Sequence, residues 1–148
     1  MTFRPVAPGD AAFLAELAAA RWSELPLPGL AELQDRAQRR EYVDRWGSEG
    51  EHVVLADDTP IGRVWWADDD GRRIVDIVLL PSMQGRGIGS GVVAALVADA
   101  GDRTVRLSVE HTKAAWRRQL ERLGFAETSS DGVFADLARP GGTQLPEV

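Results

Sequence analysis

The sequence predicts an α+β fold in which helices flank one mixed, mostly antiparallel central sheet. Strand-like segments separated by Asp-rich turns fill the middle of the chain, a nearly all-apolar helix follows them, and further helix and strand patterns lie on both sides. The expected order is strand, helix, helix, three strands, helix, strand, helix, strand. At 148 residues with 44% hydrophobic content, the chain has the size of one domain. We expect that domain over residues 1–138 and a loose tail over 139–148.

The first third of the chain reads as one strand and two helices. Residues 2–7 form the expected strand, Pro8-Gly9 closes it, and Asp10 is placed to cap the next helix. One face of that helix is apolar and consists of Phe13, Leu14, Leu17 and Ala18. Prolines and a glycine at 26–29 break the chain before a second, mainly polar helix that runs to about Arg45.

The middle of the chain reads as a three-stranded antiparallel meander. Its strands are expected at 52–56, 61–67 and 72–80. The helix expected at 90–100 is apolar on nearly every side, so the fold must cover most of it. The remaining elements are a strand at 104–110, a helix at 112–123 that stops at Gly124, and a strand at 133–137.

Composition excludes several classes of chemistry. The chain has no cysteine, which excludes disulfides, thiolate metal sites and a Cys nucleophile and fits a reducing compartment. The first residues lack a signal-peptide pattern and no apolar run approaches a membrane span, so a cytoplasmic location without membrane association is expected. The net charge of -6 disfavours nucleic acid and favours a cationic partner. A negative surface that only keeps the protein soluble explains this charge equally well.

A glycine-rich loop joins the third meander strand to the apolar helix. Gly85, Gly87 and Gly89 lie in this loop, directly before the helix expected from Ser90. A strand, a glycine turn and a helix N-terminus together present free backbone N–H groups and a positive dipole end to one point. A phosphate group is the natural ligand for such a loop, and Arg86 can add positive charge at its rim.

Two other phosphate-binding motifs fit the loop less well. A nucleoside triphosphatase loop requires a Lys after its last glycine, and no Lys follows any of these glycines. Residues 89–94 match the dinucleotide fingerprint G-x-G-x-x-A by letters. Those glycines, however, lie at and inside the helix, and an antiparallel meander precedes them where strand–helix–strand units are required.

The loop resembles motif A of the GNAT superfamily of N-acetyltransferases. That motif is Arg or Gln, two variable residues, Gly, one variable residue, then Gly or Ala, and the chain fills it with Gln84-Gly85-Arg86-Gly87-Ile88-Gly89. The order of elements also follows the family, and Leu123-Gly124-Phe125 resembles its L-G-F ending after the last helix. The resemblance implies transfer of an acyl group from acetyl-CoA, or another acyl-CoA, to an amine without a metal. It leaves both a monomer and a homodimer possible.

The resemblance also assigns the coenzyme A contacts. In the family, the pantetheine arm pairs with the backbone of the fourth strand where the fourth and fifth strands separate. This implies contacts with Ile77, Val78 and Leu79, and a backbone N–H near Leu79 that polarises the thioester carbonyl. The implied pyrophosphate cradle consists of Gln84, Gly85, Arg86, Gly87, Ile88, Gly89 and Ser90.

Direct attack on a thioester requires a neutral amine, so the site needs a base. Three residues near the expected separation of the strands are candidates: Asp76, Glu110 and His111. The imidazole has the best intrinsic pKa for this role. For each residue, a solvated charge or a cap at a strand end is an equally good interpretation.

The last helix departs from the family pattern. The family often has an Asn at the start of this helix and, four residues before the L-G-F glycine, a Tyr that protonates the leaving thiolate. These positions hold Lys113 and Leu120 here. Because coenzyme A thiolate is a tolerable leaving group, we expect catalysis to survive, with Lys113 contacting coenzyme A phosphates. A catalytically silent acyl-CoA-binding or partner-binding module is the alternative.

Aromatic residues offer a weaker signal about the acceptor. Trp65 and Trp66 are adjacent strand residues and therefore face opposite sides, so one of them is expected in the core. The other, together with Trp22, Trp46 or Trp116, either walls an acceptor pocket, which would favour an apolar or aromatic amine, or packs in the core or at an interface. Tyr42, the only tyrosine, either reaches the site or is a partly buried helix residue.

Overall fold

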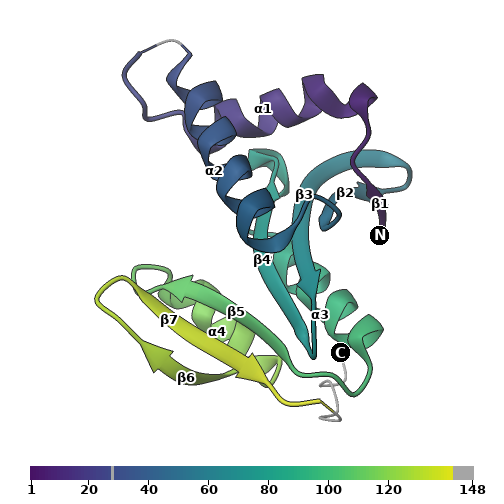
Figure 1. The fold of residues 1–148 in the computed structure, drawn as a ribbon, viewed down its shortest axis with the longest axis vertical. Helices are drawn as coiled ribbons and strands as arrows, with labels where there is room; N and C mark the ends of the chain where they lie inside the picture. Colours follow the sequence, from purple (N-terminus) through teal and green to yellow (C-terminus); the bar gives the residue numbers. More distant parts are fainter. Residues whose placement is uncertain (28, 142–148) are drawn as a thin grey trace. The chain divides into compact units, whose positions relative to one another are not determined.

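The structure, a computed structural model, describes residues 1–27 and 29–141 and confirms the predicted α+β class. Its strands form a seven-stranded sheet in the order β1-β2-β3-β4-β5-β7-β6 (Figure 1). Among the strand pairs with a described register, only β4 and β5 are parallel. The principal elements are β1 (Thr2–Pro5), α1 (Ala11–Arg21), α2 (Leu30–Trp46), β2 (Glu51–Ala56), β3 (Thr59–Asp68), β4 (Arg72–Leu79), α3 (Ile88–Ala100), β5 (Val105–Glu110), α4 (Ala114–Arg122), β6 (Ala126–Ser130) and β7 (Phe134–Arg139).

Two compact units share these elements, and β4 belongs to both. Unit 1 comprises Met1–Ala67 and Asp76–Gly85, and therefore contains β1 to β3, the second half of β4, α1 and α2. Its core is formed by strand residues and by the buried side of α1. The most deeply buried of these side chains are Leu17, Val53, Val54, Ile61, Val64 and Trp65.

Unit 2 comprises Asp68–Val75 and the chain from Arg86 onward, with α3, β5, α4, β6 and β7. The apolar face of α3 packs into its core, as the sequence predicts for a helix that must be covered. The alternating residues Val105, Leu107 and Val109 of β5 are buried in the same core. On the polar side of β5, Arg106 and Glu110 are exposed.

The C-terminal part of the chain differs from the predicted order in two places. Ala126–Ser130 forms an additional strand, β6, which pairs with β7. Every residue of β6 is exposed, so no apolar alternation marks it in the sequence. Arg139, expected in the loose tail, is instead the buried last residue of β7 and donates from Nε to the Leu123 carbonyl at 2.7 Å. Residues 142–148 of the expected tail lie outside the described residues.

Asp10 precedes α1 as predicted but does not cap it with its side chain. Its carboxylate accepts hydrogen bonds from Arg4 at 2.7 and 2.8 Å and from the Ala7 backbone N–H at 2.8 Å. The Arg4 hydrogen bonds, followed by the one from Ala7, lower the pKa of Asp10 to about 2. The ion pair with Arg4 on β1 therefore replaces the helix cap.

The two adjacent tryptophans face opposite sides of β3, as their spacing predicts. Trp65 is 1% exposed and packs edge-on against Tyr42 of α2, with ring centroids 5.4 Å apart. Trp66 is half-buried and stacks on His52 with ring centroids 3.9 Å apart. None of the helices in the described ranges is long and apolar enough to cross a membrane.

Candidate functional site

The glycine-rich loop has open space beside two of its glycines. The short 3-10 turn Pro81–Met83 follows β4, and α3 begins at Ile88. Gly85 and Gly87 have φ angles of +70° and +77°, a conformation that glycine adopts without strain. A Cβ atom added at either glycine would meet no other heavy atom within 4 Å. Space for a ligand therefore lies directly beside the loop backbone.

The start of α3 supplies the donors for an anion. The Gly91 N–H donates to the Gly87 carbonyl at 3.0 Å, so the N–H groups of residues 88–90 belong to the free first turn of the helix. α4 braces this turn, because the Ser90 hydroxyl donates to Gln119 Oε1 at 2.5 Å and the Trp116 ring lies beside Gly89. Backbone donors, a helix dipole and open space together fit a pyrophosphate group.

The strand that leads into the loop is held in place by its neighbours. At Gly62 of β3, a Cβ atom would come within 2.5 Å of the Val78 carbonyl, so only glycine allows this approach. The Leu80 N–H donates to the Ile61 carbonyl at 3.0 Å, and Gln84 Nε2 donates to the Leu79 carbonyl at 3.2 Å. The described pairing of β4 with β5 is confined to Arg72 and Arg73, the first two residues of β4.

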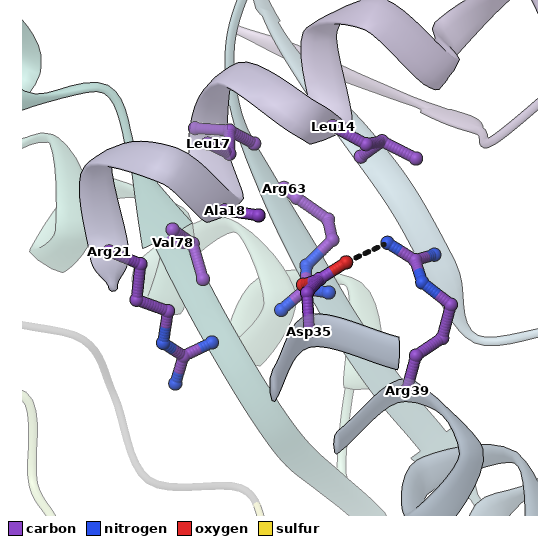
Figure 2. A pocket seen from close by; sticks show the side chains of 8 residues that line it. All are labelled: Leu14, Leu17, Ala18, Arg21, Asp35, Arg39, Arg63 and Val78. Atoms are coloured by element: carbon purple, nitrogen blue, oxygen red, sulfur yellow. Dashed lines mark hydrogen bonds and ion pairs between the residues drawn. The ribbon is translucent and has the colours of Figure 1, made fainter. Parts of the chain in front are cut away.

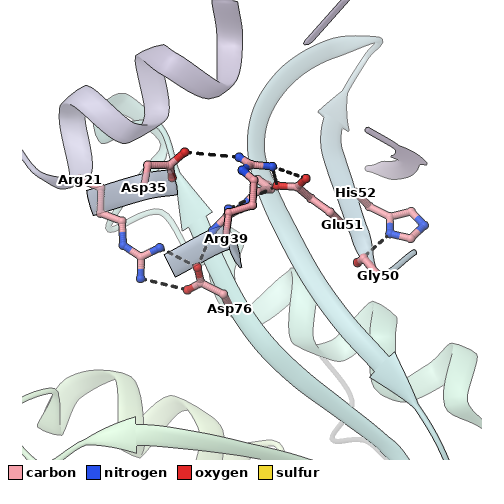
Figure 3. Close-up of polar contacts among 8 residues, drawn as sticks. Arg21, Asp35, Arg39, Gly50, Glu51, His52 and Asp76 are labelled. Atoms are coloured by element: carbon pink, nitrogen blue, oxygen red, sulfur yellow. Dashed lines mark hydrogen bonds and ion pairs between the residues drawn. The ribbon is translucent and has the colours of Figure 1, made fainter. Parts of the chain in front are cut away.

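Asp76 lies in a network of ion pairs, where the sequence predicted either a catalytic base or a solvated strand-end charge. Arg21 at the end of α1 donates to both oxygens of Asp76, at 2.6 and 3.2 Å (Figure 3). Arg63 of β3 donates to Asp76 Oδ2 from the buried side. The Asp76 side chain is only 10% exposed. Three N–H groups of these arginines therefore take up most of the hydrogen-bond acceptor capacity of the Asp76 carboxylate.

The same network extends from Asp76 to two further carboxylates. Arg63 contacts Glu51 at 3.3 Å, Arg39 donates to both oxygens of Glu51, and Arg39 lies 3.5 Å from Asp35. We call this set the ionic cluster; it comprises Arg21, Asp35, Arg39, Glu51, Arg63 and Asp76. The Arg63 side chain is 4% exposed, and its Nε has no hydrogen-bond partner among the described residues.

A small cavity and Tyr42 adjoin the ionic cluster. The cavity has a volume of about 10 Å³, enough for about one water molecule, and Figure 2 shows Arg21, Arg39 and Arg63 beside apolar residues of α1. Burial, followed by the charge of Asp76, raises the pKa of Tyr42 to about 12, although Arg21 and Arg63 act in the opposite direction. Tyr42 is therefore a half-buried helix residue whose pKa depends on the charges of the ionic cluster.

Glu110 and His111, the other two candidate bases, line one cavity of about 190 Å³ together with Arg117 and Arg118 of α4. Both candidates are exposed. The His111 ring contacts the Asp131 carbonyl from Nε2 at 2.7 Å, and since a carbonyl only accepts, Nε2 carries the proton. This tautomer leaves Nδ1 as a proton acceptor. Glu110 accepts a hydrogen bond from the Thr112 hydroxyl at 3.3 Å.

The two positions that depart from the GNAT pattern lie on α4 and its N-terminal flank. Lys113 occupies the N-cap position of α4 and is exposed. Leu120 is 0% exposed and belongs to the core of unit 2. Because this side chain is apolar, position 120 supplies no general acid in this chain.

A polar row on β4, β5, β6 and β7 was not predicted from the sequence. Arg73 Nη2 donates to the Ser108 hydroxyl at 2.7 Å, and Ser108 in turn donates to Asp136 at 2.5 Å. Ser129 donates to the other Asp136 oxygen at 2.9 Å. Ser108, followed by Ser129, lowers the pKa of Asp136. The polar side of β5 is visible in the sequence, but the partners that complete this row lie on other strands.

Comparison with known proteins places the chain in a family. Residues 14–125 match the Acetyltransferase (GNAT) family. This match spans more than half of the chain, and the protein therefore belongs to the GNAT family of acetyltransferases. No curated protein matches the sequence significantly.

Solved structures agree with this fold. A protein from Pyrococcus horikoshii OT3 is similar at 15% identity and a TM-score of 0.72, over 96% of this chain and 100% of its own. The histone acetyltransferase HPA2 and related acetyltransferase from Corynebacterium glutamicum has 18% identity and a TM-score of 0.70, over 97% of both chains. The PaiA N-acetyltransferase from Thermoplasma acidophilum, solved in complex with coenzyme A, has 15% identity and a TM-score of 0.65, over 95% of this chain and 99% of its own.

Proposed function

We propose that this protein transfers the acyl group of acetyl-CoA, or of a related acyl-CoA, directly to an amine. The open glycine loop at the start of α3 is the observation that carries this proposal. Its left-handed glycines leave space beside the backbone, and the first turn of α3 supplies N–H donors. Residues 84–90 would hold the pyrophosphate, with Lys113 as a further cationic contact for the phosphates.

The pantetheine arm is proposed to pair with the backbone of Ile77, Val78 and Leu79. The end of this segment is held by hydrogen bonds from Gln84 Nε2 to the Leu79 carbonyl and from the Leu80 N–H to the Ile61 carbonyl. The N–H near Leu79 would polarise the thioester carbonyl. A neutral amine then forms the N–C bond, the C–S bond breaks, and coenzyme A leaves as a thiolate.

His111 is the proposed acceptor of the amine proton, with Glu110 as the neighbouring alternative. The contact of His111 Nε2 with the Asp131 carbonyl fixes the tautomer in which Nδ1 is free to accept a proton. Asp76 is less suited to the task because Arg21 and Arg63 donate to its oxygens. We further propose a cytoplasmic location, in keeping with a chain that contains no cysteine.

Calorimetry with coenzyme A and a thiol-release assay with acyl-CoAs and a broad set of amines test the function. We expect coenzyme A to bind and at least one amine to release free thiol. Tight coenzyme A binding without any turnover would instead support a catalytically silent acyl-CoA-binding module. The burial of Leu120, where the family often has a Tyr, favours that second candidate.

The role of His111 has a matched control, because the chain contains only two histidines. His111→Gln is expected to remove the acidic limb of the pH–rate profile and to lower kcat about a hundredfold. His52→Gln, which changes a histidine stacked on Trp66, should retain that limb. If Glu110→Gln removes the limb and His111→Gln does not, Glu110 is the base.

A further inference from the structure

The Arg21 guanidinium occupies a site that is built for a cation. It donates to both oxygens of Asp76, and it lies over the Trp22 ring with 5.1 Å between the guanidinium carbon and the ring centroid. The Tyr42 hydroxyl is close enough to both charges for each of them to affect its pKa. A carboxylate with aromatic neighbours is the arrangement that binds ammonium and guanidinium groups.

Arg21 and Arg63 differ in how firmly they hold Asp76. The Arg63 side chain is 4% exposed and also contacts Glu51, so it is fixed inside unit 1. The Arg21 side chain is 27% exposed and belongs to the last residue of α1, where a rotation of the side chain alone takes it into solvent. Arg21 is therefore the replaceable partner of Asp76.

The charge balance of the ionic cluster indicates which kind of group can take the place of Arg21. The cluster contains three arginines and three carboxylates, each in an ion pair. If Arg21 leaves, a half-buried site keeps one uncompensated negative charge. An external cation restores neutrality, whereas an anion or a neutral group does not.

We propose that Arg21 is an internal plug in a cation site formed by Asp76, Tyr42 and Trp22, and that the acceptor carries a second cationic group which displaces it. This inference rests on the proposed acyl transfer. The second group, an ammonium or a guanidinium, anchors the acceptor while its other amine reacts. Asp76 then acts as a positioning residue and not as the base.

The strand geometry sets the spacing of the two groups on the acceptor. Asp76 directly precedes Ile77, Val78 and Leu79 on β4, all within unit 1. The proposed polarising N–H near Leu79 lies three residues beyond Asp76, which is about 10 Å at roughly 3.3 Å per strand residue. The reacting amine and the anchoring cation are therefore expected to be on the order of 10 Å apart.

A series of α,ω-diamines tests the substrate class against monoamines of the same chain length. With acetyl-CoA as donor, kcat/KM from thiol release should peak for the diamine whose nitrogens are about 10 Å apart. That diamine should exceed its matched monoamine by about tenfold or more, the worth of one charge-assisted hydrogen bond. Equal kcat/KM values for diamines and monoamines would overturn the inference.

Arg21→Ala tests the plug directly, without acyl-CoA. Calorimetry with the preferred diamine should show about tenfold tighter binding than to the native protein, because the cation site no longer competes with its own guanidinium. Arg40→Ala is the control, because Arg40 is an exposed arginine of α2 that has no ion pair among the described residues. The affinity of this variant for the diamine should equal that of the native protein. Arg21→Gln, which retains more of the side-chain length, repeats the test if Arg21→Ala melts at a lower temperature.

Tyr42 gives a readout that does not depend on turnover. Because it is the only tyrosine, a protein labelled with ¹³C at the tyrosine Cζ shows one resonance, which should shift when the diamine replaces Arg21. If the diamine binds, shifts this resonance and is not acylated, the cation site is supported and the acyltransferase function fails. If Arg21→Ala and Arg40→Ala bind the diamine equally, Arg21–Asp76 is a structural ion pair and the inference is wrong.

Discussion

The glycine loop and the ionic cluster are two polar regions built in opposite ways. The loop offers the backbone N–H groups of residues 88–90 at the start of α3, and Gly85 and Gly87 leave open space beside the backbone. The ionic cluster consists almost entirely of side-chain groups, supplied by α1, α2, β2, β3 and β4. A site made of backbone tolerates most side-chain changes that leave its space open, whereas a site made of paired charges depends on every member.

Filling the space beside the loop should have the largest effect. Gly87→Glu places a carboxylate in the cradle and should reduce coenzyme A affinity more than a hundredfold, as measured by calorimetry. Gly29→Glu is the matched control, because Gly29 precedes α2 with φ +84° and ψ -13°, close to the +77° and +4° of Gly87, and the space beside it is also open. Both variants carry similar backbone strain of about 1–2 kcal/mol. Equal coenzyme A affinity in the two variants would contradict the phosphate site.

Removing one member of the ionic cluster should strongly affect stability. Arg63→Met leaves Asp76 and Glu51 without their shared, 4% exposed partner and should lower the free energy of unfolding by about 3 kcal/mol. Urea denaturation measures this change. Arg40→Met, on the exposed side of α2, should change the free energy of unfolding by less than about 0.5 kcal/mol. A loss for Arg63→Met as small as that control would show that the cluster does not depend on each charge.

In the polar row of unit 2, serine hydroxyls hold the Asp136 carboxylate. Removing one of these hydroxyls should have a smaller effect on stability, and this effect should depend on pH. Hydrogen bonds from Ser108 and Ser129 lower the pKa of Asp136 below its unfolded value of about 3.9. This contribution to stability is therefore present above pH 4 and is lost as the pH falls through the lowered pKa. Ser108→Ala should lower the free energy of unfolding by about 1 kcal/mol at pH 7, as measured by urea denaturation. The difference between the variant and the native protein should become smaller below about pH 4.

Ser130→Ala is the control for this measurement, because Ser130 lies on β6 without a side-chain hydrogen bond among the described residues. Its stability should follow that of the native protein at every pH. A difference between Ser108→Ala and the native protein that stays constant from pH 7 to acid would show that the contribution does not depend on the Asp136 charge.

Changing a side chain of the loop should have the smallest effect. Arg86→Ala should weaken coenzyme A binding only about threefold to fivefold, since most of the proposed phosphate contacts come from the backbone. The loss should shrink further at high salt, where an exposed charge is screened. A loss as large as that of Gly87→Glu would show that the side chain, and not the backbone, holds the phosphates.

Much of the fold and the loop could be predicted because their signals are local. The apolar residues of α3, the alternation in β5 and the three glycines at the start of α3 each form a pattern of residues that are close in the chain, and each pattern specifies its own element. β6 was missed because all of its residues are exposed, and strand pairing alone defines it. Arg139 was expected in the tail because its buried contact with Leu123 leaves no local pattern.

The sequence by itself determined the fold class, the family resemblance and the candidate phosphate loop, because strand, glycine turn and helix start are contiguous. Only the tertiary structure decided which charges Asp76 contacts. Arg21 and Arg63 are 55 and 13 residues away from Asp76 in the chain, and no spacing rule links them. Folding brings these charges together in a half-buried place where each must be neutralised, and Asp76, a candidate base in the sequence, therefore lies within an ion-pair network.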